Sequence, residues 1–147
     1  MHNDNHTKKR LLHVLESIIA GVGALIGLSF IGVIAQSAHT MMLIAPFGAT
    51  AVLLFSAPNS PFSNPMNIFG GYFISTVIGS VVLTYTNAQW LPIAIGLGFV
   101  IMLMHGFRVI HPPAGANFLI VTQGHLPLAI LEPLIIGLIT LVIVGMR

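Results

Sequence analysis

The densest group of chemically capable residues is the segment RVIHPPAGA at positions 108–116, which lies in an otherwise apolar sequence. It combines a permanent cation, Arg108, with His111 and the two prolines Pro112 and Pro113. The imidazole of His111 can donate a hydrogen bond or take up a proton near neutral pH. Ionisable side chains are costly inside a membrane, so this segment indicates a functional site if the chain is a membrane protein.

The composition predicts an integral membrane protein. Hydrophobic residues occupy 56% of the 147 positions and charged residues only 5%, and the mean hydropathy is +0.99. A soluble domain carries about 25% charged residues, so too few are present here to cover a soluble surface. The excess of five basic over three acidic residues is too small for a nucleic-acid surface, and the expected partner is the lipid bilayer. The chain has no cysteine, which excludes disulfides and thiolate metal sites.

The elements that must position these residues are helices. Four long apolar stretches, at 11–35, 67–85, 91–107 and 126–146, predict membrane-spanning helices. Two shorter stretches, at 42–57 and 114–121, predict broken or half-spanning helices, because prolines and glycines interrupt them. We therefore expect an all-α polytopic bundle with four long and two short helices. Residues 1–10 are expected to form a disordered cytoplasmic tail, and residues 11–147 a single transmembrane domain.

The two short stretches are related by an internal repeat. PFGATAVLL at 46–54 aligns without gaps on PAGANFLIV at 113–121, an offset of 67 residues with three identities. Each half, at about 11–86 and 90–147, then reads long helix, short helix, long helix. If all six helices cross, the halves are inverted and every basic residue lies on the cytoplasmic side, which is the topology we favour. If the short segments re-enter instead, Arg108 lies outside and the halves are parallel.

The starts of the two short helices are candidate anion sites. A helix that begins inside a membrane leaves its first N–H groups unpaired and carries a partial positive charge there. Pro46 and Pro113 suit first turns, where the missing N–H costs nothing. Glycine permits close approach of a ligand, and threonine and asparagine add side-chain hydrogen bonds. The predicted substrate-binding residues are His111, Arg108, Gly48, Ala49, Thr50, Gly115, Ala116 and Asn117.

Two charged residues have alternative interpretations. Arg108 either anchors a helix end at the cytoplasmic headgroups or contacts a ligand. Glu132 either relays protons or forms a structural hydrogen bond across helices. The sequence contains no nucleophile–base–acid set, phosphate loop or metal-ligand cluster, so we expect neither an enzyme nor a metal or other cofactor.

Three sequence blocks, FGATAVLLF, PNSPFSNPMNIFGG and IHPPAGANFLIV, resemble in their order the HPP family of integral membrane proteins. The resemblance covers roughly residue 11 to the C-terminus. It implies about four transmembrane helices and a role in transport, and plant relatives are associated with nitrite transport into plastids. Family members often carry Gln, Arg and His where this chain has Asn64, Met66 and Tyr72.

The expected function is therefore a small transporter or channel. We expect it in a bacterial-type inner membrane, with its N-terminus in the cytoplasm. A small monovalent anion such as nitrite is the expected substrate, and a homo-oligomer is an expected assembly. The alternative is a non-transporting membrane scaffold or sensor subunit that packs against a partner.

Overall fold

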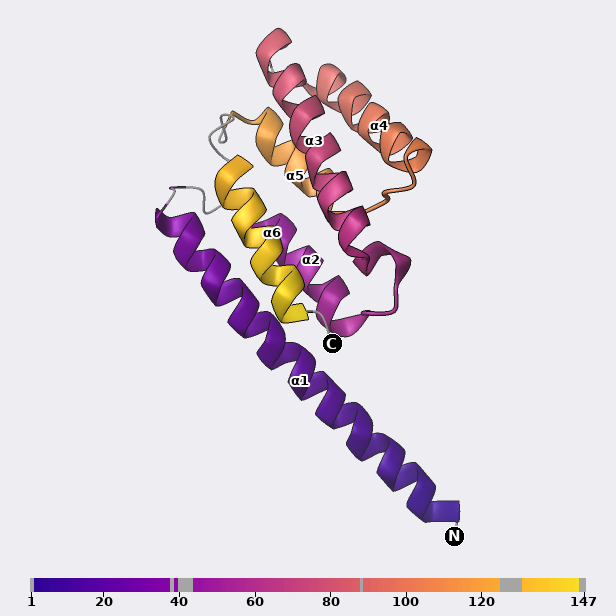
Figure 1. Ribbon diagram of the computed structural model, residues 1–147. Helices are drawn as coiled ribbons and strands as arrows, with labels where there is room; N and C mark the ends of the chain where they lie inside the picture. Colours follow the sequence, from indigo (N-terminus) through magenta and orange to yellow (C-terminus); the bar gives the residue numbers. More distant parts are fainter. Residues whose placement is uncertain (1, 38, 40–43, 88, 125–130, 146–147) are drawn as a thin grey trace.

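The structure, a computed structural model, describes residues 2–37, 39, 44–87, 89–124 and 131–145, with backbone alone for 2–5, 44 and 131–134. All regular structure in these ranges is helical (Figure 1). The elements are α1 (His2–Ser37), α2 (Ile44–Ser56), the short 3-10 helix η2 (Pro61–Ser63), α3 (Pro65–Tyr85), α4 (Trp90–Gly106), α5 (Pro113–Thr122) and α6 (Leu131–Gly145).

The helix lengths only partly match the expected four long spans. In the described residues, two helices are both long and apolar enough to cross a membrane, namely α1 and α3. The 17 residues of α4 measure about 25 Å, and the 15 described residues of α6 about 22 Å. The predicted start of the last span, at 126–130, lies outside the described residues. The two short helices are confirmed, at 13 residues for α2 and 10 for α5.

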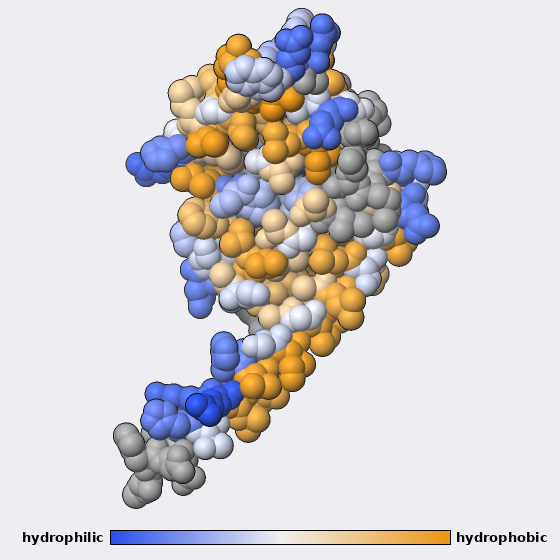
Figure 2. Space-filling model, turned by 180° about the vertical axis from the view of Figure 1, so that it is seen from behind, coloured by the Kyte–Doolittle hydropathy of each residue, from blue (hydrophilic) through white to orange (hydrophobic). Residues whose placement is uncertain are grey.

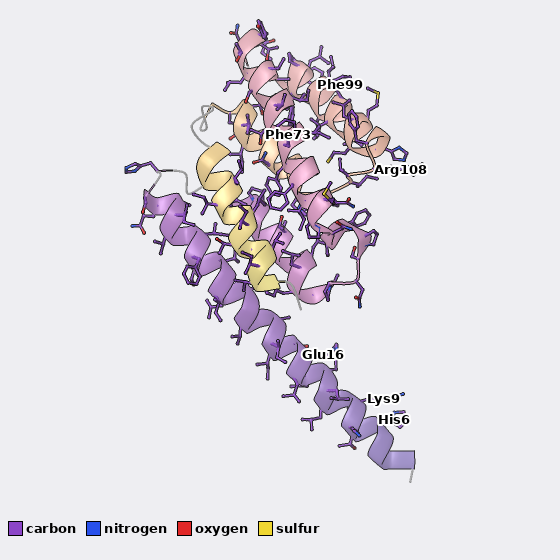
Figure 3. The ribbon with its side chains drawn as sticks, viewed as in Figure 1. His6, Lys9, Glu16, Phe73, Phe99 and Arg108 are labelled. Atoms are coloured by element: carbon purple, nitrogen blue, oxygen red, sulfur yellow. The ribbon has the colours of Figure 1, made fainter. Side chains whose placement is uncertain are left out.

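Helix α1 begins earlier than expected and extends beyond the rest of the bundle. It starts at His2, so most of the predicted disordered tail is helical. No proline or glycine occurs before Gly21, so nothing in the sequence interrupts the backbone hydrogen bonds there. His6, Lys9 and Glu16 all lie on the part of α1 that projects away from the other helices (Figure 3).

Successive helices run in alternate directions along the bundle, as six crossings require (Figure 1). The helix–helix contacts are also consistent with the predicted repeat. Among the described residues, α1 packs on α2 and α6, α4 packs on α5 and α3, and the short helices α2 and α5 contact each other. Helix α2 also contacts α6, and α5 contacts α3. Exchanging α1 with α4, α2 with α5 and α3 with α6 leaves this set of pairs unchanged, which supports an inverted repeat.

Glycines in α3 and α6 allow each short helix to pack closely against the last helix of the opposite half. A Cβ added at any of four glycines would lie 2.9 to 3.2 Å from a side chain on the facing short helix. The pairs in α6 and α2 are Gly137 with Phe47 and Gly145 with Leu54, and those in α3 and α5 are Gly71 with Ala114 and Gly79 with Val121. The glycines are eight residues apart in both helices, and the facing residues share the 67-residue offset. Close glycine-mediated packing is how membrane helices associate without a hydrophobic driving force.

Two apolar clusters form the core, one around each short helix. The first gathers Phe47, Ala51, Leu54 and Phe55 of α2 against α1 and α6. The second places Ala114 and Phe118 of α5 among residues of α3 and α4. The outer surface is also apolar along much of α1 and the bundle, and hydrophilic side chains gather at the N-terminal end of α1 and at the periphery (Figure 2). An apolar exterior of this kind suits a lipid environment.

Candidate functional site

Thr50 and Asn117, the matched polar residues of the two short helices, are both fully buried. The residues beside them are not equally enclosed. Ala49 is exposed and Gly48 is half-buried, and Gly115 and Ala116 are half-buried. In each of the predicted triplets, 48–50 and 115–117, only the third residue is fully buried, so the triplets do not form a common surface.

His111 lies between α4 and α5 and is also fully buried. Its Nδ1 is 2.9 Å from the carbonyl oxygen of Phe62, and its Nε2 is 2.9 Å from Oγ1 of Thr50. A carbonyl oxygen can only accept a hydrogen bond, so Nδ1 must carry a proton and donate. His111 thereby joins the α4–α5 connection to η2 and to α2.

Thr50 is the centre of this first polar cluster. Its Oγ1 lies 3.0 Å from the Tyr72 hydroxyl and 3.1 Å from the carbonyl oxygen of Pro46, in addition to its contact with His111. The Tyr72 ring stacks on Phe47 with centroids 5.7 Å apart, and lies 5.5 Å from the His111 ring. Aromatic packing on both sides holds the phenol against Thr50.

A second polar cluster surrounds Asn117. Its Nδ2 donates to the hydroxyls of Ser75 at 2.9 Å and Thr76 at 2.8 Å. The Ser75 hydroxyl in turn donates to the carbonyl oxygen of Tyr72 at 3.0 Å. The Oδ1 of Asn117 is buried without a protein partner. Buried polar atoms are usually paired, so this oxygen offers an acceptor position to a water or a bound molecule.

Helix α3 therefore connects the two clusters, since Tyr72, Ser75 and Thr76 lie on one helical face. Sequence reasoning missed these three residues as site residues. Their spacing of three and four positions was the available signal, because it places them together on a helix. The equivalent contact of α2 with α6 is apolar and uses Leu138, Leu141 and Val142.

The first N–H groups of α5 do not form the predicted anion site. The amide of Ala114 donates to the carbonyl of His111, and that of Gly115 donates to the carbonyl of Pro112, both at 3.0 Å. Pro112 and Pro113 have no N–H to offer. A turn that begins at His111 thus engages the amides of Ala114 and Gly115, so at the start of α5 side chains rather than these amides are the donors available to an anion.

Arg108 lies apart from both clusters. It is exposed and points away from the helices at the edge of the bundle (Figure 3). Its φ of 58° places it in the left-handed region, which is uncommon for a residue other than glycine. This position agrees with the interpretation of Arg108 as an anchor. The side chain of Glu132 lies outside the described residues, so its predicted proton relay stays a prediction.

A pocket of about 410 Å³ lies at η2. The α2–η2–α3 segment supplies most of its lining, with Gly145 of α6 on the other side. Pro61 and Ser63 line the pocket, whereas the carbonyl of Phe62 between them bonds His111. The 3-10 helix η2 therefore borders both the pocket and the buried ring.

A bundle whose described elements are all helical, with an apolar exterior and buried, uncharged polar clusters, is typical of an integral membrane protein. A family model described as HPP, transmembrane region, matches residues 9–147, and the chain belongs to that family. Two proteins of Dictyostelium discoideum, each named a transmembrane protein, are 42% identical to it over 94 and 86 residues. These matches cover 61% and 56% of this chain but only 33% and 28% of the relatives, so the chain spans about a third of their length. No solved structure matches.

Proposed function

We propose that this membrane protein is a small transporter or channel that passes a small monovalent anion such as nitrite between its two halves. The observation that carries the proposal is the buried polar cluster of Thr50, Tyr72 and His111 at the junction of α2, α3 and the α4–α5 connection. Burying three polar side chains in a bundle that could be wholly apolar has a cost in stability, and in membrane proteins such groups mark substrate pathways.

Hydroxyl, amide and imidazole groups could donate to a small anion by exchanging their present protein partners for it, and they carry no permanent charge that would hold it. The symmetric arrangement of α2 and α5 supports the same location, since transporters with inverted repeats bind substrate where discontinuous helices meet. We further propose an inner membrane of the bacterial type, a cytoplasmic N-terminus and assembly into a homo-oligomer.

Anion flux into proteoliposomes tests the proposal directly. Purified full-length chain is reconstituted, and nitrite, nitrate, formate and chloride are offered in turn against protein-free vesicles. We expect His111→Ala to lower nitrite flux while the protein still inserts, and His105→Ala, at an exposed histidine of α4, to leave flux unchanged. Tight vesicles that show no flux of any of the four anions would contradict transport.

A further inference from the structure

We infer that His111 binds a proton together with the transported anion, so that the two cross as a pair; this inference rests on the proposed transport function. It starts from the hydrogen bonds of the ring. Nδ1 donates to the Phe62 carbonyl, and Nε2 lies 2.9 Å from Thr50 Oγ1. Because a hydroxyl can either donate or accept a hydrogen bond, this contact is compatible with Nε2 in its protonated or its unprotonated form.

The neutral ring is fully satisfied. The Thr50 hydroxyl donates its proton to Nε2, and the Tyr72 hydroxyl, 3.0 Å away, donates to Thr50 Oγ1. The carbonyl of Pro46 needs nothing from the threonine side chain in this state, because it lies in the first turn of α2 and accepts within the helix.

The protonated ring is equally satisfied. Nε2–H then donates to Thr50 Oγ1, and rotation of the threonine hydroxyl directs its proton to the Pro46 carbonyl at 3.1 Å. Tyr72 still donates to Thr50, because a hydroxyl oxygen accepts two hydrogen bonds. One hydroxyl rotation therefore accommodates both protonation states without leaving a buried group unpaired. A purely structural histidine requires only one of these states.

Charge explains why the proton would arrive with an anion. The ring contacts one other titratable side chain, Tyr72 of α3, at a centroid distance of 5.5 Å. Its hydrogen-bond partners, Thr50 of α2 and the Phe62 carbonyl of η2, are uncharged. The described residues place no carboxylate there, and Arg108 is exposed and directed away. A buried imidazolium without a counter-charge is unfavourable, and an entering anion supplies that charge. Each ligand then strengthens binding of the other by the same factor.

One transport cycle moves protons and anions in equal numbers. One proton and one anion enter from the same side, the proton resides on Nε2, and both leave on the other side. No net charge crosses the membrane. Flux of nitrite should therefore acidify the receiving compartment and respond to a pH gradient but not to membrane potential.

The test uses full-length chain in vesicles that contain a pH-sensitive dye, with a nitrite gradient imposed and the signal of protein-free vesicles subtracted. We expect one proton for each nitrite and a rate that valinomycin-imposed potentials do not change. In His111→Gln, proton uptake per nitrite should fall by about tenfold or more, because the amide cannot titrate. Thr50→Val keeps the ring and removes its acceptor, so it should also lose coupling, whereas Thr50→Ser should retain it. His105→Gln, at the exposed histidine, is the matched control and should keep full coupling.

Three outcomes separate the two proposals. Nitrite flux without proton uptake, accelerated by an inside-positive potential, would overturn proton coupling and leave transport standing. Proton uptake that survives in His111→Gln and is lost in Glu132→Gln would also overturn it, by moving the proton site to α6. Absence of flux for every anion offered, in well-folded protein, would overturn transport itself and the coupling with it.

Discussion

Thr50 of α2 and Asn117 of α5 occupy matching positions of two antiparallel short helices (Figure 1), and the buried side chains of both residues contact α3. Thr50 contacts the Tyr72 hydroxyl, and Asn117 contacts the Ser75 and Thr76 hydroxyls less than two turns further along the same helix. Two residues that the repeat makes equivalent are thus connected through one helix rather than by facing each other. The buried polar contacts of both short helices therefore lie on α3, whereas the equivalent contact of α2 with α6 is apolar.

Replacing Thr50 by valine should lower both stability and nitrite flux. The substitution keeps the shape and leaves the Tyr72 hydroxyl and one ring nitrogen of His111 buried without a partner, at a cost of about 1–3 kcal/mol. Thermal unfolding in detergent, together with vesicle flux, measures both effects. Thr50→Ser, which retains the hydroxyl, should lie close to wild type. Equal stability of the valine and serine variants would contradict the described hydrogen bonds.

Placing a negative charge at Asn117 should block anion passage. In Asn117→Asp a carboxylate would face the buried path, and its repulsion of an entering anion should reduce flux by about tenfold or more. Asn87→Asp makes the same chemical change at an exposed position of the α3–α4 turn and should have little effect. Full nitrite flux in folded Asn117→Asp would place the path elsewhere.

Glycine packing between the halves should be sensitive to a single methyl group. At Gly79, an added Cβ would lie 2.9 Å from Cγ1 of Val121 and 3.3 Å from the carbonyl oxygen of Phe118. We expect Gly79→Ala to lower the free energy of unfolding by about 1–3 kcal/mol. At Gly98 nothing lies within 4 Å, so Gly98→Ala should be neutral or stabilising by up to about 1 kcal/mol. Similar unfolding temperatures for the two variants would argue against close packing of α3 on α5.

Arg108 should not be required for flux. Its side chain is exposed and points away from both polar clusters, so Arg108→Gln should change nitrite flux by no more than about twofold. A large loss with normal insertion would return Arg108 to the anion site. The measurement is the same vesicle assay, with His111→Ala as the reference for a site variant.

Single cysteines can establish the crossing number, because the natural chain has none. With six crossings and a cytoplasmic N-terminus, a cysteine at position 108 should react with an impermeant thiol reagent only from the cytoplasmic side. A cysteine at position 87, in the turn between the oppositely directed α3 and α4, should react only from the other side. Labelling of both positions from the same side would reject this topology.

The sequence alone indicates a helical membrane protein in which two short helices, α2 and α5, alternate with longer ones. Apolar runs set the helices, and the prolines and glycines near Pro46 and Pro113 set the interruptions, since both effects are local. The sequence also shows the 67-residue repeat, because the two short segments align without gaps. If all three helices of each half cross the membrane, the two halves are inverted.

Only the tertiary structure decided which residues share the site. The polar spacing along α3 groups Tyr72, Ser75 and Thr76 on one helical face, but it does not show which residues of other helices that face contacts. The structure brings Tyr72, Ser75 and Thr76 to the partners that the sequence had suggested, and it turns Arg108 outward. It also places the carbonyl of Phe62 on His111 across 49 residues of chain, a contact that depends on packing rather than on any local pattern.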